Sequence, residues 1–278
     1  MKIRLTILLC FVLILGACGT SENETDQTMD ADEGVQVELN EDKTNEPPQD
    51  EDKAEAGIEP TFKFDSEEVN LFELQIELLS NEEWSYEFNR SNQKAKIEHE
   101  NGAESEKSGE EVFSKIEELL SSIQIDYERS INDMMSQILD YLNISRDDFL
   151  KEIDVYIETS NDQILGFEYQ APSGSESTTI NELDLEIRFV SNEKWDFEYD
   201  LREQEFKIEY HNRDNLNGQD AQKEVERIIS AVNIDLDQSI GSLRESLLSA
   251  IDADASNVDA WEFEVEYEDQ MRIGVKSN

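Results

Sequence analysis

An internal duplication constrains the fold of this chain more than any other feature of its sequence. Residues 74–98 share many identities with residues 185–209, at a constant offset of 111. The matched residues are Leu74, Ile76, Ser80, Asn81, Glu82, Trp84, Glu87, Lys96, Ile97 and Glu98 in the first copy, and Leu185, Ile187, Ser191, Asn192, Glu193, Trp195, Glu198, Lys207, Ile208 and Glu209 in the second. After a loop that is two residues shorter in the second copy, the offset becomes 109. This agreement predicts two copies of one fold.

The spacing of apolar residues changes twice within each copy. In the first copy, apolar and polar residues alternate over 72–78, 84–88 and 95–97, which predicts three antiparallel strands with one apolar face. Helical spacing over 112–123 and 131–142 then predicts two amphipathic helices.

Alternation returns near the end of each copy and predicts a closing hairpin. It covers 153–157 and 165–169 in the first copy, and 261–267 and 271–275 in the second. A sheet with one apolar face needs a cover, and the helix pair is the only candidate. The sequence therefore predicts an α+β fold of two tandem domains. Each is a mainly antiparallel sheet, with elements in the order βββααββ, covered on one face by a helix pair.

The N-terminal segment has the pattern of a lipoprotein signal peptide over residues 1–17. Lys2 and Arg4 precede an apolar run that is too short to span a bilayer comfortably. Leu15-Gly16-Ala17-Cys18 resembles the lipobox of bacterial lipoproteins, in which the cysteine receives a diacylglyceryl group. We expect Cys18 to carry lipid and to anchor the chain to the extracytoplasmic face of the cell membrane.

The composition of the remaining chain sets the other boundaries. Residues 18–60 are rich in acidic and polar residues and should form a disordered tether. Two domains are expected at 61–170 and 178–278, with a short linker at 171–177. The only other cysteine, Cys10, lies in the predicted signal peptide, so thiolate metal sites and disulfides are not expected in the mature protein.

The chain is strongly acidic, with 68 acidic and 23 basic residues and a formal charge of -45. Such a surface repels phosphate backbones, so we expect no nucleic-acid partner. We expect such a surface to attract basic peptides and to hold divalent cations weakly. The simpler interpretation is that the acidic surface keeps an exported protein soluble.

Two segments carry a family resemblance. Gly109-Glu110-Glu111-Val112-Phe113 and Glu152-Ile153-Asp154-Val155, together with the order of the elements, resemble the YusW-like domain of lipoproteins from Bacillus and its relatives. The resemblance covers nearly all of residues 62–278 as two copies, although the second copy has Gly218-Gln219-Asp220-Ala221 in place of the first motif. It implies the fold and the location, and it implies no activity and no functional residues.

The sequence contains no convincing catalytic or cofactor pattern. There is no nucleophile elbow, phosphate-binding glycine loop or zinc spacing. His99 and His211 are expected at the surface, near the end of the third strand of each copy. Trp84 and Trp195 are expected in the core rather than on a sugar-binding surface. We therefore expect no enzyme, no cofactor and no metal site.

Charged residues that alternate with the core positions are the best candidates for ligand contacts. These candidates are Glu87, Lys96, Glu98, Glu198, Lys207 and Glu209. Cross-strand ion pairing is the simpler interpretation of these charged residues. The more specific hypothesis is that this face of the sheet binds a basic ligand. Asp126 and Asp235 are expected to cap local turns. A calcium loop is not expected at Asp30 or at Asp252, because the later ligand positions are missing.

These observations favour a membrane-anchored, non-enzymatic module that binds a protein, peptide or envelope component. The alternative is an acidic envelope protein that handles divalent cations.

Overall fold

The computed structural model describes residues 64–278, apart from 101–103, 146–149, 176 and 212. The predicted signal peptide, Cys18 and the tether lie outside the described residues. Within the described part of the chain, no helix is long and apolar enough to cross a membrane.

Each repeat contributes six strands and two α-helices to the described structure. The first repeat comprises β1 (Val69–Leu78), β2 (Glu83–Asn89), β3 (Lys94–Glu100), β4 (Glu104–Ser108), α1 (Glu110–Ser122), α2 (Ile131–Leu142), β5 (Leu150–Thr159) and β6 (Ile164–Gln170). The second comprises β7 (Ile180–Phe189), β8 (Lys194–Asp200), β9 (Glu205–Tyr210), β10 (Leu216–Asn217), α4 (Gln219–Ala231), α5 (Ile240–Ala250), the 3-10 helix η1 (Ala255–Asn257), β11 (Val258–Tyr267) and β12 (Arg272–Ser277).

The predicted order βββααββ lacks one strand in each repeat. β4 follows β3, and the two-residue strand β10 follows β9 at the equivalent place. β4 has the sequence ESEKS and contains no apolar residue, so apolar alternation could not reveal it.

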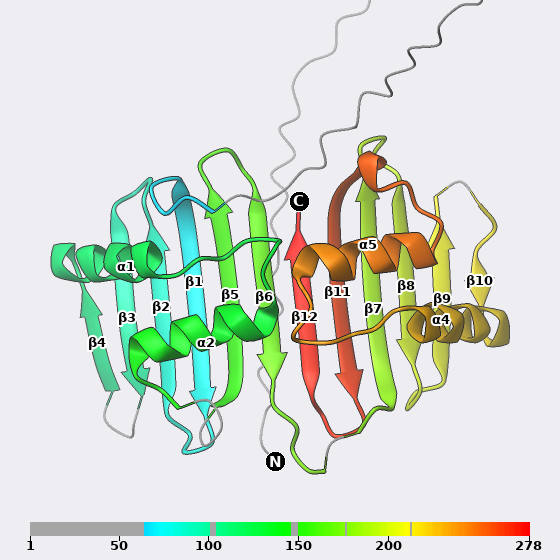
Figure 1. Cartoon of the computed structure of the whole chain (residues 1–278), viewed down its shortest axis with the longest axis horizontal. Helices are drawn as coiled ribbons and strands as arrows, with labels where there is room; N and C mark the ends of the chain where they lie inside the picture. The colour runs from blue at the N-terminus through cyan, green and yellow to red at the C-terminus, as the bar shows by residue number, and fades with distance from the viewer. Residues whose placement is uncertain (1–63, 101–103, 146–149, 176, 212) are drawn as a thin grey trace, which may run out of the picture. The chain divides into compact units, whose positions relative to one another are not determined.

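All of the described strands form one antiparallel sheet of twelve strands (Figure 1). Their order is β10-β9-β8-β7-β11-β12-β6-β5-β1-β2-β3-β4. The predicted α+β class and antiparallel sheet are confirmed. The repeats meet where their last strands pair, β6 with β12, so the two repeats are halves of a single sheet.

Burial alternates along the strands, as the sequence pattern requires. In β1, Phe72, Leu74 and Ile76 are fully buried, while Glu73 and Gln75 between them are exposed. Buried side chains of the strands and of the helices form one hydrophobic cluster. The described helices lie on one side of the sheet in Figure 1. We call the opposite side, which carries the alternate polar residues, the open face.

Two glycines at equivalent positions let the repeats approach closely on the open face. Gly166 lies opposite Lys276, and Gly274 lies opposite Glu168, on either side of the Phe167–Val275 pair. A Cβ on Gly166 would lie 2.9 Å from Cε of Lys276. The lysine stem therefore uses the space that a side chain on Gly166 would fill.

Buried polar contacts also join the repeats on the helix side. Tyr127, in the loop before α2, accepts a hydrogen bond from Nε1 of Trp261 at 3.1 Å and donates one to the hydroxyl of Ser277. Its carbonyl accepts from the amide of Gly241 at 2.8 Å. These contacts fix the first repeat against β11, β12 and α5 of the second.

Candidate functional site

The six candidate residues from the sequence lie in two separate groups on the outer strands of the open face. Glu87 lies opposite Lys96 on β2 and β3, and Glu198 lies opposite Lys207 on β8 and β9. The structure does not bring the two groups together, because β7, β11, β12, β6, β5 and β1 lie between them.

Ion pairs connect most of these candidates. In the first repeat, Nζ of Lys96 lies 2.8 Å from the carboxylate of Glu98. In the second, Nζ of Lys207 lies 3.1 Å from Glu209 and 3.8 Å from Glu198. The pair in the first group runs along β3, whereas the pairs in the second group run along β9 and across to β8.

The centre of the open face carries acidic residues that the sequence analysis did not single out. Strand register places four of them, Asp184, Glu264, Glu168 and Asp154, in a row across the sheet that begins beside the candidate Glu198, with Gly274 between Glu264 and Glu168. The alternation of Glu262, Glu264 and Glu266 along β11 was the available signal. The row extends from one repeat to the other, with Gly274 at the crossing point.

Arg272 is the main counter-charge at the centre of this row. Its guanidinium lies 3.2 Å from Glu264, 2.9 Å from Glu266 and 3.5 Å from Glu168. Glu168 belongs to the first repeat, so this arginine links the repeats electrostatically. Arg202 makes a further ion pair with Glu266.

Burial, together with the crowding of carboxylates, raises several pKa values on the open face. Burial, followed by repulsion from Glu182 and Glu198, raises the pKa of Asp184 to about 6. Burial, followed by repulsion from Glu168, raises the pKa of Glu264 to about 7, although Arg272 opposes the shift. The ionised form of this face is therefore electrostatically strained near neutral pH.

This strain predicts that the fold becomes more stable on acidification from pH 7.5 to 5.5. A carboxyl group whose pKa is raised by folding holds a proton that the unfolded chain releases, so its stabilising contribution is lost as the pH rises towards 6 or 7. Asp184→Asn should raise Tm at pH 7.5 by about 2 to 4 °C and weaken the pH dependence, after allowance for solvent screening.

Thermal unfolding at both pH values measures this effect. The matched control is Glu245→Gln, which removes one charge from the exposed surface of α5. Equal effects of the two substitutions would mean that only net charge matters, and would contradict local strain at Asp184.

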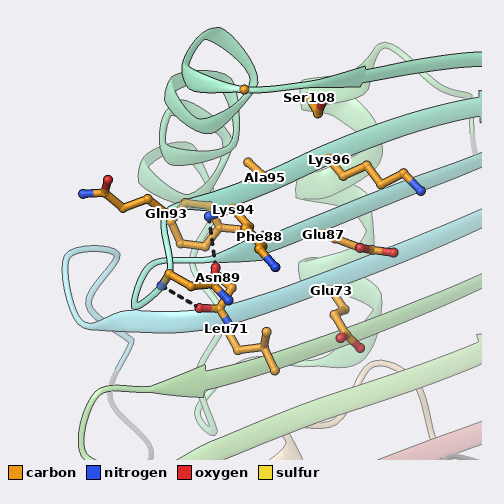
Figure 2. Close-up of a pocket in the computed structure, with 12 residues that line it drawn as sticks. Leu71, Glu73, Glu87, Phe88, Asn89, Gln93, Lys94, Ala95, Lys96 and Ser108 are labelled. Carbon is orange, nitrogen blue, oxygen red and sulfur yellow. Dashed lines mark hydrogen bonds between the residues drawn. The ribbon is translucent and has the colours of Figure 1, made fainter.

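A depression of about 540 Å³ lies on the first repeat's half of the open face (Figure 2). Its lining includes Leu71, Glu73, Glu87, Asn89 and Lys96, from β1, β2 and β3. Figure 2 shows Glu73 and Glu87 side by side on neighbouring strands. The depression thus combines an apolar side chain, two carboxylates, an amide and an ammonium group.

The other residues that the sequence singled out have structural roles. Trp195 is buried as predicted, whereas Trp84 is half-buried and stacks on His99 with ring centroids 3.8 Å apart. His99 thus differs from the predicted surface histidine, because it packs beside the core, while His211 is exposed beyond β9.

The predicted turn residues form local turns. The carboxylate of Asp126 accepts a hydrogen bond from the amide of Glu128 at 3.0 Å, and Asp235 accepts one from Asp237 at 2.9 Å. Asp254 likewise accepts from Ser256. Across the described residues, no group of three or more His, Cys, Asp or Glu side chains is arranged to hold a metal ion.

Comparison with known families gives one match, found twice. The family described as YusW-like protein matches residues 70–161 and again residues 181–269. No curated protein matches the chain, and no solved structure does. Each match begins in the first strand of a repeat and ends before its last strand, β6 or β12.

Proposed function

The chain belongs to the YusW-like family, with two copies of the family's domain, and from this premise we propose that it is a non-enzymatic binding module for a protein or peptide that bears positive charge. The carboxylate row that crosses the β6–β12 junction carries this proposal. A continuous acidic surface complements an extended basic polypeptide better than a compact ligand.

The arrangement of each repeat supports the same proposal. In our interpretation, each repeat is an antiparallel sheet whose own helix pair covers the apolar face. The polar face is then left for a partner. Two copies in one sheet give a partner twice the strands to contact, which raises the effective concentration of acidic sites.

We propose that the protein is located at the outer face of the cell membrane. Lipid on Cys18 would anchor the chain, and the acidic tether of residues 18–60 would hold the sheet away from the lipid surface. A flexible chain of this length has a root-mean-square reach of roughly 35 to 40 Å. A module at this distance could contact proteins or peptides of the cell envelope.

Site-specific photocrosslinking in intact cells tests the proposal. A photoreactive residue at Gln75, exposed on the open face, should capture a partner with a basic segment, and added sodium chloride should reduce the yield. The same residue at Ser114, exposed on α1, should not. Capture from Ser114 alone, or no product from Gln75, would overturn the proposal.

The alternative function, divalent-cation handling, is favoured by the strained carboxylates Asp184 and Glu264. It predicts that calcium chloride raises Tm with a sharp, stoichiometric end point. A gradual rise that sodium chloride reproduces at equal ionic strength would indicate screening alone.

A further inference from the structure

The two halves of the open face have different chemistry at equivalent positions. Leu71, Gln75, Ser85, Asn89 and Tyr156 of the first repeat stand where the second repeat has Glu182, Glu186, Asp196, Asp200 and Glu264. Tyr156 and Glu264, for example, lie opposite Glu73 and Asp184 on the equivalent pair of strands. The first half is therefore amphipathic, whereas the second is charged, with carboxylates and the basic residues Arg202, Lys207 and Arg272 that pair with them.

The first half already receives one lysine side chain. The stem of Lys276 crosses Gly166, and its Nζ lies 4.6 Å from the centroid of the Tyr156 ring. Methylene groups thus pack on the sheet while the ammonium group meets an aromatic face. This contact shows how the surface accommodates a long cationic side chain.

Glu73 and Glu87 lie beyond Tyr156 in the cross-strand row of Lys276, Gly166 and Tyr156, next to the carboxylate row. They lie directly opposite each other on β1 and β2, where like charges destabilise a sheet. Neither forms an ion pair with another described residue, whereas Lys96, opposite Glu87, contacts Glu98. Partial burial on the sheet, followed by the charge of Glu87, raises the pKa of Glu73, although Lys276 opposes the shift. An added cation between the two carboxylates would relieve this repulsion.

The depression provides space for such a cation at the same place. Leu71 supplies apolar surface, and the amides of Asn89 and Gln93 supply hydrogen-bond donors. Guided by the proposed function, on which this inference rests, we propose that the depression binds a lysine side chain of an extended basic polypeptide. Its ammonium group lies between Glu73 and Glu87, its stem packs on Leu71, and its main-chain carbonyls face the amides.

Paired neutral variants of the full-length chain, purified in detergent, test this inference. The probe is a fluorescein-labelled peptide of alternating lysine and serine, because alternate residues of an extended chain point to one side. Glu73→Gln with Glu87→Gln should weaken its binding about tenfold or more, as loss of close charge pairs does. Asp184→Asn with Glu198→Gln removes the same charge at the equivalent positions of the second repeat. This matched double variant should bind the peptide only about two- to threefold more weakly, because it reduces only the long-range electrostatic attraction.

The outcomes separate this inference from the proposed function. Equal weakening by both pairs would overturn the lysine site and leave a general acidic binding face. No binding of the peptide by the unaltered chain would overturn both. Retained binding of a peptide with Nε-acetylated lysines would also overturn the site, because its ligand would not need the ammonium group. Equally tight binding of spermidine would overturn the choice of a polypeptide. Circular dichroism confirms that each variant is folded.

Discussion

Cys18→Ser is expected to release the protein from the membrane fraction and to abolish incorporation of labelled palmitate. Serine has no thiol to receive the diacylglyceryl group, and cleavage before residue 18 requires that modification. Acyl chains contribute about 0.8 kcal/mol for each buried methylene, so two chains anchor stably where one is marginal. Cell fractionation and metabolic labelling measure the result.

Cys10→Ser is the matched control, because it alters the only other cysteine and lies within the predicted signal peptide. This variant should remain labelled and membrane-bound. If the Cys18 variant stayed labelled, or if the mature protein began with an unmodified residue, the lipid anchor would be excluded.

Tyr127→Phe should cost about 2 to 4 kcal/mol of unfolding free energy. The substitution removes a buried hydroxyl that bonds both Trp261 and Ser277 of the second repeat. Each of these groups would remain buried without that partner, at about 1 to 3 kcal/mol for an unsatisfied group. In urea unfolding, the midpoint should fall with little change in slope.

Tyr199→Phe is the control for this prediction. Tyr199 is also buried, and its hydroxyl has no hydrogen-bond partner among the described residues. Its substitution should change the unfolding free energy by less than about 0.5 kcal/mol, as expected for a change that breaks no interaction. Similar losses in both variants would show that Tyr127 does not join the repeats in the way described.

Much of the fold could be predicted because apolar alternation depends only on local sequence. The strand around Leu74 and the helix around Ile116 follow directly from such spacing. β4 could not be found in this way, because it has no apolar residue. The pairing of β6 with β12 depends on contacts between distant segments. Its one local signal was a glycine at equivalent positions of both repeats, Gly166 and Gly274.

The candidate site was predicted in part for the same reason. Alternation predicts that Glu87 and Lys96 project from the polar face, and the structure places both at the depression. Glu73 and Leu71 were missed because their importance depends on strand register. Only the pairing of β1 with β2 brings Glu73 opposite Glu87, and the sequence contains no direct record of that pairing.

Carboxylate labelling with mass-spectrometric readout tests the open face as a binding surface most directly. The full-length chain is labelled with and without the lysine and serine peptide. Binding should protect Glu73 and Glu87 strongly, while Glu118 on α1 and Glu245 on α5 keep their reactivity. Protection of the helix surface instead, or a uniform decrease at all four residues, would contradict binding at the open face.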